Sequence, residues 1–300
     1  MSHPLQFVKS TLVTPAMLVA SNVPETDYPA WAVGTTYAKD ARVIVVSEHK
    51  IYQSVQAGNL GKSPATEDTW WKEVSATNRW KLLDLSSSTQ TVSAGDIYYE
   101  IKPGVATTAL CLLNMSGALS VRGRVTDPTF GVMYDKTTSL ISIPGESGWY
   151  AWFFGERTQE DQFIALDLPS YPNAVIRIDV TGAPSIGVLM LGQLKSIGIG
   201  VRSGARVGIK DFSMKSRNEW GDTVLKPGAF ADRASFTLLL ANAEVDNVKR
   251  QLTSVRGAPC LFIGYQRYAC TIVFGFYQEF DIVIPYLHNS ECTIDIEGLT

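Results

Sequence analysis

The sequence predicts a mostly β protein, made of a small aromatic β-module, an antiparallel β-sandwich and a C-terminal β-sheet that carries one helix. Three observations predict this class. Charged residues make up 18% of the chain, below the roughly 25% of an average globular protein. Short apolar runs recur at regular spacing between Gly- and Pro-containing turn signals. One segment near the C-terminus combines helical apolar spacing with start and stop signals.

Length and charge limit the organisation and the partners. A chain of 300 residues is long enough for more than one domain, because single cores stop growing near this length. A net charge of -3 gives no broad electrostatic attraction to nucleic acid. No run approaches the ~20 apolar residues of a membrane helix, and the first residues lack the pattern of a signal peptide. We therefore expect cytoplasmic synthesis, without membrane insertion or a nucleic-acid partner.

The first two parts are a leading segment, residues 1–28, and a small module, residues 29–76. In the leading segment, Thr14-Pro15 favours one or two helical turns. The module contains two predicted strands, 41–46 and 50–55, joined by a polar turn. A unit of fewer than ~50 residues has a weak apolar core unless additional contacts stabilise it, and large aromatic side chains can supply those contacts.

Those aromatic side chains are also the candidate carbohydrate-binding residues, because the flat apolar face of a sugar stacks on Trp or Tyr. Neighbours in a strand point to opposite faces, so an adjacent Trp pair cannot lie wholly in the core. Structural packing without a ligand and glycan binding are both open. The candidates are Trp31, Tyr37, Tyr52, Trp70 and Trp71.

Residues 77–184 predict an antiparallel β-sandwich, because short strands alternate with turn signals such as Pro103-Gly104 and Ser116-Gly117. The run 174–180 alternates Ile and Val with Arg and Asp, as a half-buried strand should. The strand candidates are 96–101, 107–115, 119–125, 131–134, 149–154, 163–168 and 174–180.

Residues 185–300 predict a strand at 186–191, then a Gly-hinged arm or long loop, then a sheet with one helix. The arm has recurrent glycines from Gly192 to Gly208 among basic residues, without the interleaved aromatics of a nucleic-acid platform, which favours contacts between subunits. In the sheet, Asn242 can cap a helix at 243–255, and Gly257 ends it. The predicted strands are 236–240, 260–263, 268–277, 280–284 and 292–296.

No catalytic constellation is present in the sequence. The three histidines lie at a terminus, in a turn and in a loop, and we expect them at the surface. The four cysteines form no C-x-x-C pair, so we expect buried free thiols, although Cys260 and Cys270 could face each other across a hairpin. We therefore expect no enzyme, cofactor or metal. The carboxylates available for a glycosidase-type pair are Asp211, Glu219, Asp222, Glu279 and Asp281.

The module resembles the chitin-binding type 5/12 class of carbohydrate-binding modules. The resemblance rests on Trp31, Thr36-Tyr37, Val43, Tyr52, Pro64 and Trp70 or Trp71. It covers about a seventh of the chain, and the sequence departs from the pattern at 39–42, where Lys-Asp-Ala-Arg replaces the usual Gly-Asp.

The wider succession of motifs is similar to a family of tailed-bacteriophage virion structural proteins described as carrying a carbohydrate-binding domain. The motifs are Pro15-Ala-Met-Leu-Val-Ala-Ser, Thr77-Asn-Arg-Trp-Lys-Leu-Leu-Asp, Arg256-Gly-Ala-Pro and Phe274-Gly-Phe-Tyr. The resemblance implies a part of the tail or baseplate. The order of strand, helix and hairpin strands near the C-terminus is similar to the fold of tail-tube proteins.

The sequence therefore predicts a non-enzymatic structural component of a tailed-phage virion, at the tail tip, baseplate or fibre-attachment region. The expected partners are further copies in a homo-oligomeric ring and other tail proteins, with host surface glycans as the candidate ligand. The expected location is the virion, after assembly in the host cytoplasm. One alternative is a glycan hydrolase with an accessory binding module, which needs a carboxylate pair in a central cleft. The other alternative is a secreted bacterial glycan-binding protein, which the missing signal-peptide pattern in this sequence disfavours.

Overall fold

The computed structural model describes residues 3–142, 149, 157–217, 219–284 and 289–299. Strands dominate, the sheets are antiparallel, and helix α2 (Val245–Thr253) is part of the C-terminal unit, so the predicted mostly β class is confirmed. The chain divides into two compact units, Thr11–Leu191 and Met1–Ser10 with Gly192–Thr300. The division at residues 28, 76 and 184 stays a prediction.

Within Thr11–Leu191, the aromatic module contains a three-stranded sheet in the order β4-β5-β7 and a separate β3-β6 pair. Both predicted strands are present, and the turn between them places His49 at φ 58°, in the left-handed region. Val43 lies opposite Tyr52, and Ser54 lies opposite Trp71. The strands are β3 (Thr36–Tyr37), β4 (Arg42–Val45), β5 (Lys50–Ser54), β6 (Asn59–Leu60) and β7 (Trp71–Ala76).

The rest of Thr11–Leu191 encloses one large apolar core, with fully buried side chains such as Leu82, Ile101 and Leu112. Strands β9, β15, β10 and β11 lie side by side in this order. The elements are β2 (Leu18–Ser21), η1 (Lys81–Leu83), β8 (Thr91–Val92), β9 (Ile97–Ile101), β10 (Ala109–Asp127), β11 (Gly131–Ser139), β12 (Ile141–Ser142), β13 (Thr158–Gln159), β14 (Phe163–Ala165) and β15 (Val175–Ile197).

The turn predicted at Ser116-Gly117 is wrong, and so is the break between the strands expected at 174–180 and 186–191. The strands expected at 107–115 and 119–125 form the single strand β10, and those expected at 174–180 and 186–191 form β15. Gly117 and Gly182 allow close contact between the two strands: a Cβ on Gly182 would lie 2.5 Å from the Gly117 carbonyl oxygen. Glycine thus serves a close backbone approach here, where the sequence indicated a turn.

Two further predictions concern local structure. The helical turns expected from Thr14 are wrong beyond one hydrogen-bonded turn, because Leu18–Ser21 forms β2 and pairs with β9. The strand expected at 149–154 lies outside the described residues, except for the exposed Trp149.

The C-terminal unit is a curved sheet whose strand path returns to its start. The order is β15-β1-β21-β22-β23-β20-β16, and β16 follows β15 after two residues. The Val201 N–H also donates to the His3 carbonyl at 2.8 Å, which links β16 to the segment before β1. The elements are β1 (Leu5–Ser10), β16 (Gly200–Val201), β17 (Arg206–Asp211), β18 (Met214–Arg217), β19 (Thr223–Lys226), β20 (Phe230–Ala241), η2 (Asn242–Glu244), α2 (Val245–Thr253), β21 (Cys260–Ile263), η3 (Ala269–Thr271), β22 (Ile272–Val283) and β23 (Asn289–Gly298).

The core of this unit joins α2 to the sheet. Val248 and Leu252 on the helix pack with Phe7, Phe236 and Phe262, all of which are buried. The Phe7 and Phe262 rings stack at 6.2 Å between centroids. The predicted helix and its apolar side are therefore present, although α2 begins two residues later than expected, after the 3-10 turn η2.

Three expectations for this unit are corrected. Residues 192–201 belong to the sheet and not to an arm, and Gly192 serves close contact, because a Cβ there would lie 2.2 Å from the Lys9 carbonyl oxygen. The strand expected at 268–277 begins at Ile272, after a turn in which the Thr271 hydroxyl donates to the Tyr265 carbonyl. Cys260 lies opposite Gly275 and not opposite Cys270, and Cys270 is an exposed free thiol.

Candidate functional site

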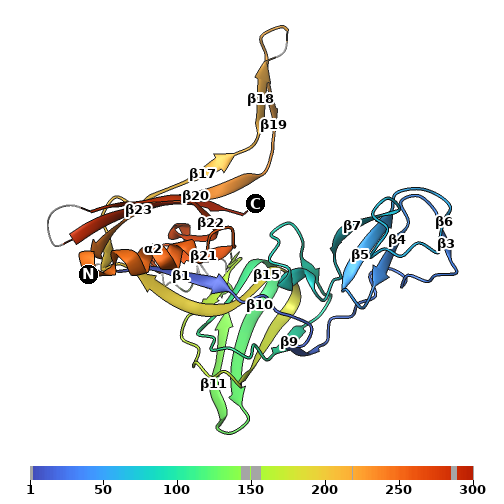
Figure 1. Ribbon diagram of the computed structural model, residues 1–300, viewed down its shortest axis with the longest axis horizontal. Helices are drawn as coiled ribbons and strands as arrows, with labels where there is room; N and C mark the ends of the chain where they lie inside the picture. Colours follow the sequence, from blue (N-terminus) through green and yellow to red (C-terminus); the bar gives the residue numbers. More distant parts are fainter. Residues whose placement is uncertain (1–2, 143–148, 150–156, 218, 285–288, 300) are drawn as a thin grey trace. The chain divides into compact units, whose positions relative to one another are not determined.

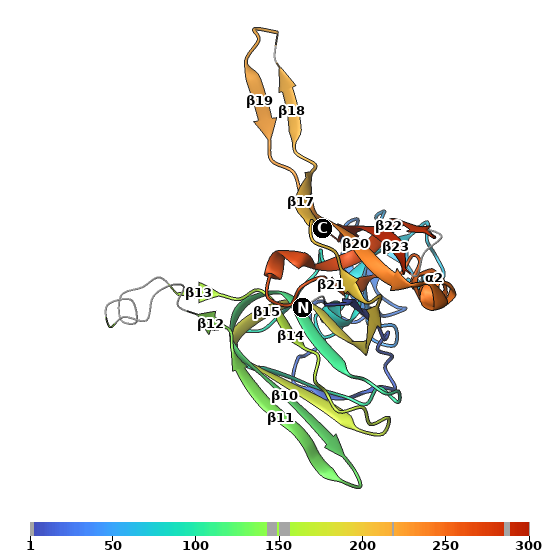
Figure 2. The ribbon, with the colours of Figure 1, turned by 90° about the vertical axis from the view of Figure 1, so that its left-hand side faces the viewer.

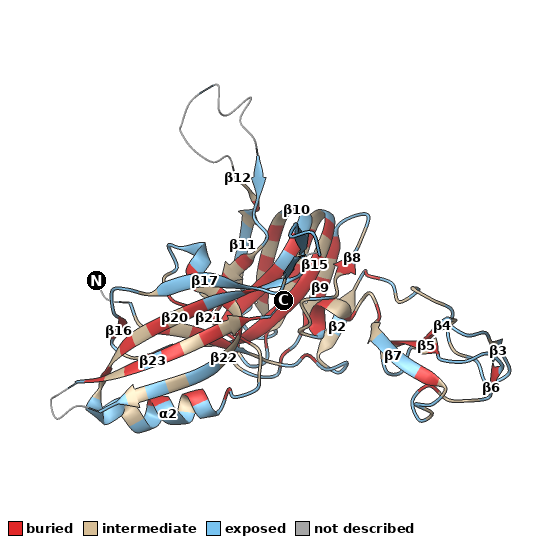
Figure 3. Ribbon diagram, turned by 90° about the horizontal axis from the view of Figure 1, so that it is seen from above, coloured by how far each residue is buried: buried red, intermediate tan, exposed pale blue. Residues whose placement is uncertain are grey.

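The most prominent surface feature is a β-hairpin, residues 206–230, which we call the arm. Its base is the pairing of β17 with β20, and its outer part is the pairing of β18 with β19. Every described residue of the arm is exposed except the half-buried Ser213. Figures 1 and 2 show the arm extending away from the curved sheet, and β17 is exposed along its length in Figure 3. The arm therefore adds no buried side chain to the core of its own unit.

A compact elbow fixes the outer part of the arm relative to its base. The Phe212 N–H donates to the Ala229 carbonyl, and the Gly228 N–H donates to the Ser213 hydroxyl, each at 3.0 Å. A Cβ on Gly228 would lie 2.7 Å from the Phe212 carbonyl oxygen, so only glycine fits without a shift of the backbone. The Asp211 carboxylate accepts the Ser213 N–H at 2.9 Å. These contacts give the arm a defined direction.

The elbow predicts a pH effect. Hydrogen bonds from the Ser213 hydroxyl and N–H, with Lys215 at 3.0 Å, lower the pKa of Asp211 from 3.8 to about 2. A lowered pKa means that the carboxylate supports the elbow above pH 3.8 and that this support is lost as the pH falls toward 2. We expect Asp211 to be mainly ionised at pH 3, and Ser213→Ala to raise its pKa. Carboxyl-selective NMR titration measures this, and an unperturbed midpoint in the wild type would contradict the geometry.

One face of the arm base carries an apolar stripe that continues the core-facing side of β20, with Asp211 and Asp232 on the same face. Paired residues of antiparallel strands share a face, so Val207 lies with the buried Ala234, and Ile209 and Phe230 lie on that same face. Their side chains are exposed at 47%, 63% and 57%. The apolar side of the sheet thus continues past the part that its own core covers. Exposed apolar stripes of this kind are typical of surfaces that contact another molecule.

The outer part of the arm adds further apolar side chains and a positive charge. Met214, Leu225 and Trp220 are exposed at 60%, 65% and 86%. Strands β18 and β19 carry three cations, Lys215, Arg217 and Lys226, and no carboxylate.

The aromatic candidates separate into core and surface. Trp71, Tyr52 and Val43 form the buried core of the module, and Trp71 is only 2% exposed. The Trp71 indole N–H donates to the Lys62 carbonyl at 2.9 Å, and Tyr37 packs edge-on against Trp71 at 5.2 Å. The Tyr52 hydroxyl donates to Glu48 at 2.6 Å, and burial raises the pKa of Tyr52 above its usual range.

Trp31 and Trp70 are the half-buried members of the set. Trp70 immediately precedes β7, and Lys62 lies over its ring at 5.7 Å. The buried indole N–H of Trp31 has no hydrogen-bond partner among the described residues. The structure thus places Trp70 and Trp71 differently, with one partly at the surface and the other in the core. Whether any of the five candidates binds a glycan stays a prediction.

An open hollow of about 480 Å³ lies on the module beside Tyr52 and Trp71. Three carboxylates, Glu48, Asp68 and Glu73, contribute to its lining. Glu73 pairs with Lys50 at 2.7 Å, and Glu48 accepts the Tyr52 hydroxyl. Two of these carboxylates therefore already have partners within the module.

A polar network around Glu25, which the sequence gave no signal to find, joins the module to the segment that follows it. Glu25 contacts His49 at 2.9 Å, Arg79 at 3.0 Å and the Trp80 indole N–H at 3.2 Å. The His49 ring stacks on Trp80 with 4.4 Å between centroids. His49 lies in the predicted turn but is half-buried, because its ring packs in this network, so the expectation of a surface histidine holds only in part. His288 lies outside the described residues.

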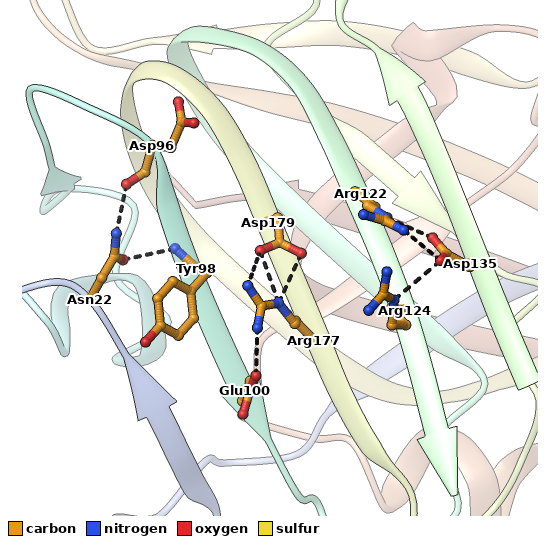
Figure 4. Close-up of polar contacts among 9 residues, drawn as sticks. All are labelled: Asn22, Asp96, Tyr98, Glu100, Arg122, Arg124, Asp135, Arg177 and Asp179. Atoms are coloured by element: carbon orange, nitrogen blue, oxygen red, sulfur yellow. Dashed lines mark hydrogen bonds and ion pairs between the residues drawn. The ribbon is translucent and has the colours of Figure 1, made fainter. Parts of the chain in front are cut away.

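Glu100, Asp135 and Asp179 of the sandwich lie in a charged stripe on one face of the sheet (Figure 4). Arg177 on β15 pairs with Asp179 and with Glu100 on β9, each at 2.8 Å. Arg122 on β10 pairs with Asp135 on β11 at 2.7 Å and lowers the pKa of this carboxyl. A glycosidase needs one carboxyl with a raised pKa as general acid, and the shift of Asp135 is in the opposite direction.

No group of three or more His, Cys, Asp or Glu side chains among the described residues could hold a metal ion. No helix in that part of the chain is long and apolar enough to span a membrane.

Comparison with known proteins leaves the family open. No protein-family model and no curated protein matches the chain. Among solved structures, one similar chain comes from the tail of an empty GTA particle with C6 symmetry. The two share 16% identity over 36% of this chain and 84% of that chain, with a TM-score of 0.28. Values this low do not establish a shared fold, so both resemblances found in the sequence stay predictions.

Proposed function

We propose that this protein is a non-enzymatic structural component of a tailed-phage-type particle and that it assembles with further copies of itself. The arm is the observation that carries the proposal. A hairpin with a fixed elbow and an apolar stripe has no role in its own core, and water is a poor environment for that stripe. A neighbouring subunit would cover it. The proposed type of particle rests on the sequence motifs that resemble those of tailed-phage virion proteins.

The edges of the curved sheet support assembly in the same way. Strand β21 covers only Ile272–Gly275 of β22, so the rest of that edge has no strand partner among the described residues. The outer edge of β17 is likewise without a strand partner in that part of the chain. Uncovered strand edges are templates for pairing with another chain, and a closed ring of subunits would cover them.

The module supplies a second candidate role, contact with host glycans. Trp31 and Trp70 are the half-buried aromatic faces that favour it, together with the adjoining hollow. Repeated weak sites in a symmetric assembly would add their affinities through valency. The hydrolase alternative has less support, because Glu100, Asp135 and Asp179 of the sandwich are each paired with arginine (Figure 4).

The particle itself gives the test. We expect quantitative mass spectrometry of purified particles from the source of this chain to find it at several copies per particle, in a fixed ratio to other tail proteins. Its absence from particles that carry their full set of tail proteins would contradict the proposal. Release of soluble sugars from host cell-wall or capsule material by the purified protein would favour the hydrolase.

A further inference from the structure

Two surfaces of the C-terminal unit carry opposite charges at the same spacing. On the outer part of the arm, Lys215 and Arg217 are two residues apart in β18 and share one face, on which Leu225 lies opposite Lys215. On β22, Glu279 and Asp281 are also two residues apart and share one face with Val283. Residues two apart in a strand are separated by about 6.6 Å, so both surfaces place two charges and an apolar group in similar geometry.

The acidic surface is the outer side of the curved sheet. Phe280 and Ile282 on β22 pack on the core, so their neighbours Glu279, Asp281 and Val283 point to the opposite side. Asp295 on β23 lies opposite Glu279 and adds a third carboxylate without an ion pair among the described residues. Glu291 and Glu297 are on the same face and pair with Arg202 and Lys210. Val283 is 64% exposed.

The cations of the arm remain able to bind a partner. Arg217 pairs with no carboxylate of the described residues. Lys215 contacts Asp211 at 3.0 Å, but its side chain is 65% exposed, and an ammonium group has three hydrogens to donate. In Figures 1 and 2 the arm extends away from β22 of its own chain. The acidic face that it can meet is therefore on another molecule.

We propose that the arm of one copy docks on the outer face of β22 and β23 of a second copy. Lys215 and Arg217 pair with Glu279 and Asp281, and Leu225 packs against Val283. This inference rests on the proposed self-assembly and names the surface that receives the arm. The contact is heterologous, because different surfaces of the two copies meet, and repetition of such a contact generates a ring or a filament.

Charge reversal tests the pairing. The double variants Lys215→Glu/Arg217→Glu and Glu279→Lys/Asp281→Lys each bring like charges together, so we expect the concentration for half-assembly to rise by at least about tenfold in each. An equimolar mixture of the two variants restores opposite charges at every contact. We expect the mixture to assemble where neither variant does alone. Sedimentation velocity measures all three samples, with circular dichroism as the control for folding.

Two further samples distinguish the docking surface from assembly in general. Lys226→Glu makes a comparable charge change on the other face of the hairpin, so it should weaken assembly less than Arg217→Glu does. If shortening the arm abolishes assembly but the double variants assemble like the wild type, the arm docks elsewhere and only this inference fails. If the unmodified protein stays monomeric at every concentration, the proposed self-assembly fails as well.

Discussion

Replacement of residues 212–229 by Asn-Gly should abolish self-assembly and leave the C-terminal unit folded. Asp211 and Phe230 are directly paired at the base of the arm, and a two-residue Asn-Gly loop joins paired strand ends as a type I′ turn. The deletion removes the elbow, the outer hairpin and the three cations of β18 and β19. It retains β17, β20 and every buried side chain of the core.

The expected size of this effect follows from burial. Changes at exposed positions away from packed contacts usually alter the free energy of unfolding by less than about 0.5 kcal/mol, so the melting temperature should be nearly unchanged. In sedimentation experiments, the shortened protein should have the mass of one chain at concentrations where the wild type is oligomeric. A shortened protein that assembles like the wild type would show that the arm does not mediate the contact.

A matched substitution separates loss of the arm from loss of its direction. Gly228→Val retains every other residue of the arm but places a side chain against the Phe212 carbonyl, so the elbow must shift. We expect assembly weaker than in the wild type and stronger than in the shortened protein. An effect equal to that of the full deletion would mean that direction alone governs docking.

Trp71→Ala should unfold the aromatic module. Trp71 is the largest side chain of a small cluster whose other buried members, among the described residues, are Val43 and Tyr52. Truncation of a buried Trp costs about 3–5 kcal/mol, and a core this small rarely supplies more than that. The large core of Thr11–Leu191 contains none of these three residues, so we expect the remaining strands to stay folded.

The adjacent tryptophan provides the matched control. Trp70 is half-buried and its backbone hydrogen bonds persist in an alanine variant, so Trp70→Ala should cost about 1 kcal/mol. Hydrogen exchange of the β5 and β7 amides distinguishes the two outcomes, because only Trp71→Ala should remove their protection. Equal loss of protection in both variants would contradict the division into core and surface. If the module binds N-acetylglucosamine oligomers, Trp70→Ala should weaken binding in a folded module.

Local signals predicted much of this fold. Alternation and turn residues located β4, β5, β9 and β23, and apolar spacing and the stop signal located α2 within about two residues. The predicted cap is wrong, because Asn242 lies in η2 and Glu244 is at the N-cap position of α2. The adjacent Trp70 and Trp71 were expected to differ in burial, and they do. These features depend on neighbouring residues, so a single sequence contains the information needed to find them.

Contacts between residues far apart in the sequence account for the predictions that were wrong. Gly117 and Gly182 permit contact between β10 and β15, and Gly192 permits contact with β1, but the sequence indicates only that glycine is present. The pairing of β1 with the end of β15 places Leu5 opposite Ile197, with the whole of Thr11–Leu191 between them in the sequence, and periodicity does not show such a contact. For the same reason, the sequence alone does not show that Lys215 and Arg217 on the arm have the same two-residue spacing as Glu279 and Asp281 on one face of β22, because this depends on the strand registers.

The native mass of the unmodified protein tests the central claim most directly. Light scattering across a wide range of concentrations should give a discrete mass that is a multiple of 32.8 kDa. That mass should fall as salt is added, because screening weakens contacts between charged surfaces. A mass of one chain at every concentration, in low salt and with the arm intact, would contradict the account.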